Sequence, residues 1–412
     1  MNLKYLFLTV ILFVTYSCDN DDSDFELVQV AVPEVMSKTD FRNSVHIKSA
    51  QQIEEAGKIY AYQDYIFIGD KGGVHVIDNS NPENPNAKAF IEIPKNEDIS
   101  VKDNFLYADS ATDLLVFDIS DINAIVMIER LEDVFDVYNF GIPLQAEVVD
   151  YQGFDDRNSV IVGWTVTLER RKKQNDDLLI DVVFDSNTGG FNSVESAVGI
   201  GGSLARFQIV SDYLYTVGSQ KMTIFNIQNL ETPVLENIQY VGWNIETMFQ
   251  ADNYLYLGST NGMFIYALEN PSLPEFVSEF IHWEGCDPVV VDGQYAYLTL
   301  RGGNACGQQE SVLEVIDITD RTNPILAGRY TLENPYGLGF QGNTLYVCDG
   351  TAGLKLFDIS DPLNVKLNGS IEGIETTDVI PLQNSLILIG NNTLYQYRYS
   401  ENNLQLISSL SI

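Results

Sequence analysis

The chain has few basic residues, few histidines and little sign of helix. Its 58 Asp and Glu residues outnumber its 23 Lys and Arg residues, so the formal net charge of the 412-residue chain is −35. Nucleic-acid binding needs a basic face that neutralises phosphates, and the acidic excess excludes it. The same excess argues against docking of the chain itself onto an anionic lipid surface. The three histidines are scattered and have no zinc-site spacing with the four cysteines, so we expect no metal and no cofactor.

Catalytic motifs are also missing. The chain has no nucleophile elbow of the form G-x-S-x-G. Gly337–Gly342 matches the dinucleotide pattern G-x-G-x-x-G, but a strand and a hairpin turn follow it instead of the helix that would hold a pyrophosphate. The acidic run Asp19–Asp24 lacks the turn glycine and the terminal glutamate of a calcium loop. Motifs therefore support neither an enzyme nor a bound cation such as calcium.

The first residues form a short export signal. Lys4 precedes an apolar stretch over residues 6–14, which is too short to span a bilayer. With Cys18 and the acidic run Asp19–Asp24 behind it, this segment resembles a bacterial lipoprotein signal, although Thr15 stands where an aliphatic residue is usual. The acidic run also resembles the surface-export signal of Bacteroidetes lipoproteins. The resemblance implies cleavage before Cys18, lipidation of Cys18 and a place at the cell surface of the outer membrane, with its periplasmic leaflet as the alternative. An ordinary signal peptide with an acidic linker is the other interpretation.

A phrase of alternating apolar residues recurs along the rest of the chain. The last residues of its eight copies are Asp78, Asp118, Asp185, Asn226, Ala267, Asp317, Asp358 and Arg398. Five of the seven spacings are 40 or 41 residues, and the other two are 67 and 50. Each unit reads as four short strands separated by turn residues, which predicts an all-β protein, a β-propeller of four-stranded antiparallel blades. Eight units favour eight blades; the alternative is seven, with the irregular third unit as an insertion.

Two copies of the phrase carry a family resemblance. Residues 313–319 and 353–362 resemble the LVIVD repeat of bacterial surface and secreted proteins, and the chain has no WD40 pattern. The resemblance implies a β-propeller and says little about activity. Because Asn226 and Ala267 replace the aspartate of the motif, we interpret this aspartate as a turn residue at the end of a strand. We therefore expect a signal peptide over 1–17, a lipidated cysteine with an acidic tether and a leading segment over 18–50, and the propeller over 51–412.

Three longer segments predict which face of the propeller is functional. Residues 131–142, 167–177 and 301–307 fall in loops expected on one face of the disc, and loops on a rigid scaffold often carry binding residues. The candidate binding residues of this face are Arg170, Arg171, Lys172, Lys173, Trp243, Trp283 and Arg301. The alternatives are a solvated basic loop and tryptophans that pack between blades. Cys286 opens a blade below the loop that holds Cys306, so we expect a disulfide between them or, alternatively, two free thiols, and a buried Cys348.

Four carboxylates fall near the starts of the innermost strands, which line the mouth of a propeller channel. They are Asp98, Glu246, Asp287 and Asp378. They could act on a sugar as an acid/base pair or bind a cation, or they could only solvate the channel mouth. We expect a cell-envelope lipoprotein that serves as a non-catalytic platform for a protein or glycan partner, touches the membrane through its lipid anchor only and has no catalytic residues. The alternative is a hydrolase of polysaccharides that uses these carboxylates.

Overall fold

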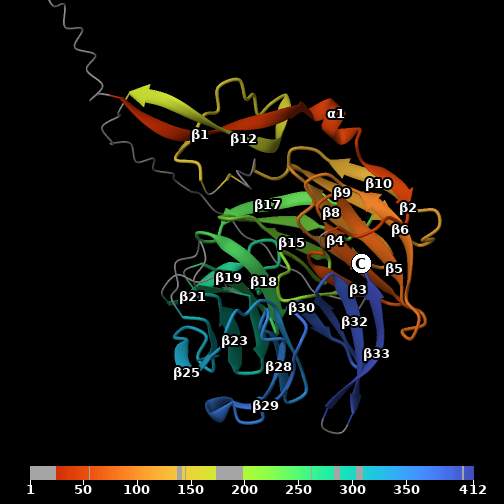
Figure 1. Ribbon diagram of the computed structural model, residues 1–412, viewed down its shortest axis with the longest axis vertical. Coiled ribbons are helices and arrows are strands. Elements are labelled where there is room, and N and C mark those ends of the chain that lie inside the picture. The colour runs from red at the N-terminus through yellow and green to blue at the C-terminus, as the bar shows by residue number, and fades with distance from the viewer. Residues whose placement is uncertain are drawn as a thin grey trace, which may run out of the picture. The chain divides into compact units, whose positions relative to one another are not determined.

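A computed structural model describes residues 25–54, 56–136, 142–143, 145–172, 198–260, 262–282, 288–302, 310–400 and 403–412 (Figure 1). The chain divides into a smaller unit, residues 1–35 and 139–182, and a larger unit, residues 36–138 and 183–412. The described part contains no helix with the length and apolarity that a membrane span needs.

The larger unit consists of antiparallel sheets, each built on four consecutive strands of the chain, and the first of these sheets has one further strand at each edge. Their strands are β3 (Ile59–Tyr62), β4 (Tyr65–Asp70), β5 (Gly73–Asp78) and β6 (Asn86–Glu92); β7 (Ile99–Lys102), β8 (Phe105–Ser110), β9 (Asp113–Asp118) and β10 (Val126–Leu131); β14 (Phe207–Val210), β15 (Tyr213–Val217), β16 (Lys221–Asn226) and β17 (Val234–Tyr240); β18 (Ile245–Ala251), β19 (Tyr254–Ser259), β20 (Gly262–Ala267) and β21 (Glu275–Ile281); β22 (Val289–Asp292), β23 (Tyr295–Leu300), β24 (Val312–Asp317) and β25 (Ile325–Thr331); β26 (Leu338–Gln341), β27 (Thr344–Cys348), β28 (Leu354–Asp358) and β29 (Lys366–Ile371); and β30 (Thr376–Pro381), β31 (Ser385–Gly390), β32 (Thr393–Ser400) and β33 (Asn403–Ser411). A 3₁₀ turn, η2 (Pro362–Asn364), precedes β29.

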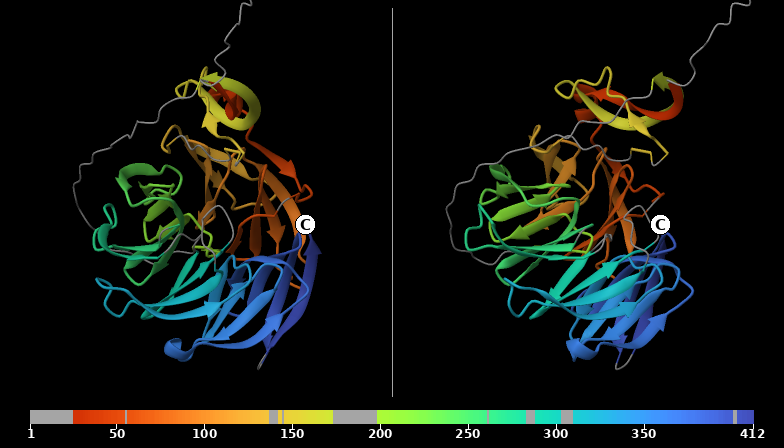
Figure 2. Two further views of the ribbon diagram at one scale, coloured as in Figure 1. Left: turned by 60° about the vertical axis from the view of Figure 1, so that its left-hand side comes forward. Right: turned by 90° about the vertical axis from the view of Figure 1, so that its left-hand side faces the viewer.

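These sheets are the blades of a propeller. Their innermost strands contact one another in the order β3, β7, β14, β18, β22, β26, β30, and β30 contacts β3 again. Figure 2 shows the blue strands of the last blade beside the orange strands of the first. The predicted all-β propeller of four-stranded antiparallel blades is confirmed. The described residues form eight sheets, the same number as the repeats. Seven of these sheets have the blade pattern and form the ring, which is the alternative blade count given above. The eighth is a three-stranded sheet of the smaller unit.

The repeat aspartate is a turn residue, as predicted. In four blades the carboxylate of Asp78, Asp118, Asp317 or Asp358 accepts a hydrogen bond from the backbone N–H two residues later, at 2.8–3.0 Å. The amide oxygen of Asn226 makes the same bond at 2.9 Å, so asparagine can replace aspartate without loss of the turn. The bond starts the loop to the outermost strand, and its role is structural.

Packing and hydrogen bonds close the ring between the last blade and the first. Ile59 of the first blade and Ile380 of the last share a buried apolar cluster. At the outer edge, Gln396 Nε2 donates to Asn79 Oδ1 at 2.7 Å, and Ser408 Oγ donates to the carbonyl oxygen of Pro82 at 2.6 Å. Among the described residues the two blades exchange no strand, so these contacts of side chains with the neighbouring blade close the ring.

The segment before the first blade is fastened to the larger unit by a cluster of charges. After helix α1 (Lys38–Arg42), strand β2 (His46–Ser49) pairs antiparallel with β6 and adds an outer strand to the first blade. Arg42 donates from Nε and Nη2 to the two oxygens of Asp113, at 2.8 and 2.9 Å, and Arg130 donates to the same carboxylate at 2.9 Å. Burial would raise the pKa of Asp113, but hydrogen bonds from the two arginines and from the Asp133 N–H hold it below its usual range.

The smaller unit contains the three-stranded sheet, in the order β11-β1-β12. β1 is Phe25–Ser37, β11 is Val148–Val149 and β12 is Ser159–Lys172. Residues 167–177 were expected in a loop on one face of the propeller, and this prediction is wrong for the described residues 167–172. Residues 159–172 instead form one strand beside β1, because β1 buries Val30 and Ala31 and needs partners on both edges.

Candidate functional site

Three of the predicted carboxylates lie where the innermost strands begin. Asp98 precedes β7 directly, Glu246 is the second residue of β18 and Asp378 is the third residue of β30. We call this end of the propeller the mouth face. It also carries the loops between the second and third strands of each blade and the connections from one blade to the next. Asp287 lies outside the described residues.

One segment runs along the inside of the ring to the mouth. Residues 198–206 begin beside Lys102 at the far end of β7, pair with β3 through a short strand β13 (Ile200–Gly201), and reach the start of β14 at the mouth. On the way, Ser203 Oγ accepts a hydrogen bond from the Leu338 N–H of β26 at 2.8 Å, and the Ala205 carbonyl oxygen accepts one from the Met248 N–H of β18 at 2.7 Å. Because it is bonded to innermost strands of several blades, this segment, here called the mouth segment, closes the channel.

The mouth segment needs small residues. A side chain added at Gly199 would meet the ring of Tyr60, and one added at Gly202 would meet the carboxylate of Asp378. Glycine is therefore required by close approach at these positions. The run Gly199-Ile200-Gly201-Gly202 was the signal in the sequence that could have identified this segment, and the sequence analysis did not use it.

Asp98 holds the end of the mouth segment. Its Oδ2 accepts hydrogen bonds from the N–H groups of Arg206 and of Phe207, the latter at 3.0 Å, and its Oδ1 accepts one from the Ile99 N–H at 2.8 Å. Lys58 Nζ lies 3.6 Å from Oδ2. The carboxylate is 6% exposed. Asp98 is therefore an anchor for backbone groups, and its oxygens have partners within the protein.

Asp378 is a second buried anchor. Its Oδ1 accepts a hydrogen bond from the Val379 N–H at 3.0 Å, and its Oδ2 accepts one from the Ile59 N–H at 3.5 Å. Burial raises the pKa of Asp378 to about 7, although these two hydrogen bonds and Lys58 oppose the shift. Near neutral pH this carboxyl is therefore divided between its neutral and charged forms.

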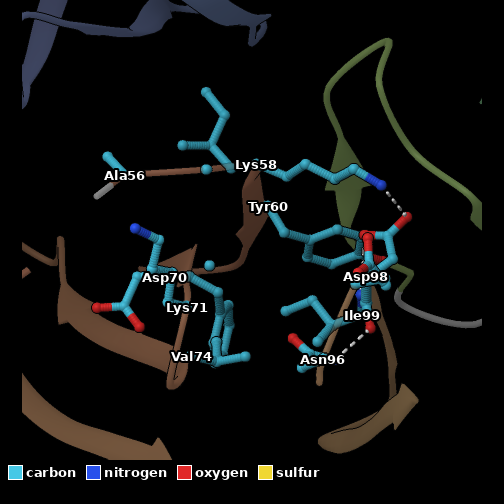
Figure 3. Close-up of a pocket in the computed structure, with 14 residues that line it drawn as sticks. Ala56, Lys58, Tyr60, Asp70, Lys71, Val74, Asn96, Asp98 and Ile99 are labelled. Atoms are coloured by element: carbon cyan, nitrogen blue, oxygen red, sulfur yellow. Dashed lines mark hydrogen bonds and ion pairs between the residues drawn. The ribbon is translucent and has the colours of Figure 1, made fainter. Parts of the chain in front are cut away.

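Two cavities open beside the mouth segment. The first has a volume of about 330 Å³ and lies between the first two blades, lined by residues 56–60 and 96–99 and by parts of β4 and β5. In Figure 3, the side chain of Lys58 runs across this cavity toward Asp98, while Asp70 lies on the other side. Asp70 is bonded to His75 Nε2 at 2.7 Å. Lys58 Nζ is buried and donates no hydrogen bond to any of the described residues, so its ammonium can donate to a ligand or to water.

The second cavity has a volume of about 260 Å³ and contains three basic side chains. They are Lys58, which both cavities share, Arg206 and Arg301. Arg301 stacks on the ring of Tyr336, with its guanidinium carbon 4.2 Å from the ring centre, and Arg206 Nε donates to the carbonyl oxygen of Glu246 at 3.1 Å. A guanidinium over the face of an aromatic ring is attracted by the ring's π electrons. Sequence patterns gave no signal for Lys58, Arg206 or Tyr336.

The other predicted binding residues are dispersed. Trp243 is 59% exposed in the connection from β17 to β18 and meets Tyr240 edge-on, with ring centres 5.8 Å apart. Arg170, Arg171 and Lys172 belong to β12 of the smaller unit. Cys348 is buried, and burial raises the pKa of its thiol. Lys173, Trp283, Cys18 and the predicted pair Cys286 and Cys306 lie outside the described residues. Within the described ranges, no three His, Cys, Asp or Glu side chains are arranged to hold a metal ion.

The family comparison agrees with this architecture. The model of the LVIVD repeat matches residues 55–90, 95–133, 286–332 and 338–372. The chain carries LVIVD repeats. The four matched copies correspond to the first, second, fifth and sixth blades, so the repeat is the blade. The resemblance drawn from the sequence is confirmed.

Solved structures show the same fold. A computationally designed protein, Ika8, superposes with a TM-score of 0.50 at 10% identity, covering 88% of this chain and 90% of its own. A Bacteroides fragilis protein provisionally assigned as a 6-phosphogluconolactonase gives 0.50 at 10% identity, covering 92% and 97%. BamB from Moraxella catarrhalis gives 0.49 at 10%, covering 92% and 99%. A search of curated proteins found no match. At these identities the likeness concerns the fold alone.

Proposed function

We propose that this LVIVD propeller is an exported lipoprotein that acts as a non-catalytic platform and binds a protein or glycan partner at the mouth face. The observation that carries the proposal is that the two buried carboxylates at the mouth bind backbone groups of the protein itself. Asp98 and Asp378 are buried and accept hydrogen bonds from backbone N–H groups, Asp98 at the end of the mouth segment and Asp378 on β30 and β3, so both have structural roles. The partner would therefore bind the surface around the mouth segment.

The second cavity indicates the chemistry of the partner. In a chain with a net charge of −35, three basic side chains meet at one cavity of about 260 Å³. Arg301 lies over the ring of Tyr336, and a guanidinium can donate two parallel hydrogen bonds to one carboxylate. An acidic side chain of a protein and a uronic acid of a glycan both present this group, and both fit the proposal.

The polysaccharide hydrolase is less well supported. Hydrolysis of a glycoside needs two carboxyl groups that face one cavity. Of the predicted carboxylates, Asp98 lines the first cavity, Glu246 lines the second, and Asp378 lines neither of these two. The first cavity is lined by Asp70, Glu97 and Asp98, but Asp70 and Asp98 are bonded within the protein. The second cavity is lined by Glu97 and Glu246, and this pair is the one to test for turnover.

The test uses two matched arginines. Arg301 stacks on Tyr336 at the mouth face, whereas Arg321 stacks on Tyr254 in the turns at the opposite end of the blades, with its guanidinium carbon 4.6 Å from the ring centre. Partners would be crosslinked on intact cells that express the natural protein, Arg301→Ala or Arg321→Ala. We expect Arg301→Ala to lose the partner at least tenfold, as a charged hydrogen bond is worth about 1.5–3 kcal/mol, and Arg321→Ala to keep it.

Two results would contradict the proposal. Equal recovery of the partner with all three proteins would remove the mouth face from binding. Release of sugar from an acidic polysaccharide by the natural protein, abolished by Glu246→Gln, would replace the platform with a hydrolase. Palmitate labelling and its loss in Cys18→Ser would separately test the lipid anchor.

A further inference from the structure

The free end of the β1–β12 ribbon has one face with an unusual composition. Arg170 lies over the ring of Phe25, with its guanidinium carbon 4.8 Å from the ring centre, and Thr165 Oγ1 donates to Glu34 at 2.5 Å. The start of β1 therefore lies beside the end of β12, and the two strands are antiparallel, as Figure 1 also shows. Side chains alternate along a strand, so these two contacts define its two opposite faces.

The face that holds Phe25 carries apolar and basic side chains. Alternation places Leu27 on it from β1, and Leu168 and Lys172 on it from β12 together with Arg170. Phe25 is 42% exposed, and Leu27 and Leu168 are each 63% exposed. Arg170 and Lys172 are exposed as well. Neither strand contributes a carboxylate to this face, although the chain has 58 acidic residues. We call these five residues the ribbon-end face.

The opposite face has ordinary surface chemistry. Arg171 is paired there with Asp150 at 2.5 Å and with Glu169 at 3.0 Å. Glu26 and Glu34 of β1 are on the same side by alternation. The lack of carboxylates is therefore specific to the ribbon-end face and is not shared by the other face of this sheet.

The chain length fixes what the ribbon-end face can reach. Cys18 and Phe25 are seven positions apart, and seven extended residues span at most about 25 Å. If Cys18 carries the lipid, the face cannot move farther than this from the bilayer. Exposed aromatic and leucine side chains beside Arg and Lys are the composition of surfaces that lie in the membrane interface, where basic side chains extend to lipid phosphates.

We propose that the ribbon-end face rests in the lipid interface beside the anchor and orients the chain on its membrane. This inference relies on the lipid anchor of the proposed function. The net charge of −35 opposes free association with an anionic surface, so the anchor supplies attachment and the face supplies orientation. Tethering raises the local concentration of lipid, so the ribbon-end face can bind the lipid interface even if its own affinity is low.

The experiment replaces the natural anchor, so that it does not depend on acylation. Residues 18–412 with Cys18→Ser would be held by an N-terminal hexahistidine tag on vesicles of phosphatidylcholine, phosphatidylglycerol and a nickel-chelating lipid. A polarity-sensitive fluorophore would be attached at Leu27→Cys. Leu406→Cys, in β33 and 51% exposed, is the matched control position, and protein without an introduced cysteine gives the background labelling.

We expect lipid-chain quenchers to reduce the fluorescence at position 27 at least twofold more than at position 406. The double variant Arg170→Glu/Lys172→Glu should remove this difference, because each basic residue near a charged lipid surface contributes about a factor of five. The same reversal at Lys366 and Arg398 of the larger unit should leave it unchanged. Equal quenching at positions 27 and 406, or quenching that survives the reversal at Arg170 and Lys172, would overturn the inference. Absence of acylation in cells would contradict only the lipoprotein proposal.

Discussion

Replacing Asp378 with asparagine tests whether the mouth is built on a buried carboxyl that resists ionisation. Asp378 is 1% exposed, and burial raises its pKa from 3.8 to about 7. In the unfolded chain the carboxyl ionises near its ordinary value, so the folded state binds the proton more tightly. The stability that this proton provides is complete below the unfolded pKa and is lost as the pH rises through the folded pKa.

The size of the effect follows from the two pKa values. A difference of about three pKa units corresponds to about 4 kcal/mol of unfolding free energy lost by pH 8, of which about 2.5 kcal/mol falls between pH 5 and pH 8. The Asp378→Asn variant cannot ionise. Its amide oxygen can still accept one backbone hydrogen bond, so at pH 5 it should lose only about 1 kcal/mol. At pH 8 it should be more stable than the natural protein.

Urea denaturation at pH 5 and pH 8 measures both quantities. The control is Asp358→Asn. Hydrogen bonds from Ser360 hold the pKa of Asp358 below its usual range, so its contribution is constant above the unfolded pKa and its loss should be equal at both pH values. If Asp378→Asn changes stability equally at pH 5 and pH 8, the carboxyl ionises normally in the folded protein, and the account of the mouth given above is wrong.

Three further substitutions test other parts of the fold by the same denaturation assay. Arg42→Met should cost about 3 kcal/mol, because it leaves the buried Asp113 with Arg130 as its remaining basic partner, and a loss below 1 kcal/mol would mean that α1 is not fastened by this pair. Gly202→Ala should cost about 1–3 kcal/mol because its Cβ would meet Asp378, whereas Gly369→Ala, where the space is open, should be nearly neutral; equal effects would contradict the mouth segment's close approach. Tyr107→Phe should cost about 1 kcal/mol, since its hydroxyl donates to the Leu230 carbonyl oxygen of the next blade at 2.9 Å, and no loss would mean that this bond does not join the blades.

The sequence pattern predicted the blades because the strands that pair within a blade are consecutive in the chain. Four consecutive strands form one sheet, and turn residues such as Asp103 and Ser211 have the positive φ angles that tight hairpins need. The predicted role of Asp78 and Asp118 as turn residues is confirmed for the same reason, since their partners are two positions away. The irregular third unit had no such local guide, because β12 pairs with β1, more than 120 residues earlier in the chain.

The mouth could be predicted only in part. The starts of the innermost strands follow from the repeat, and this placed Asp98, Glu246 and Asp378 near one end of the ring. Their roles depend on the mouth segment, whose bonds join Asp98 to Phe207 and Leu338 to Ser203 across more than 100 positions. No periodicity encodes such contacts. The three basic side chains of the second cavity come from three separate stretches of the chain for the same reason.

The closed mouth has a consequence for how this propeller can work. The chain that leaves the second blade after β10 forms part of the smaller unit and then returns as the mouth segment, so one insertion supplies both. A ligand that passed through the channel would have to break the bonds of Ser203, Ala205 and Asp98 and displace Gly202 from Asp378. Each buried bond left unmade would cost about 1–3 kcal/mol, so opening is unfavourable. A partner that binds over the segment instead keeps all of these bonds, and this favours recognition at the surface of the mouth over transport or chemistry inside it.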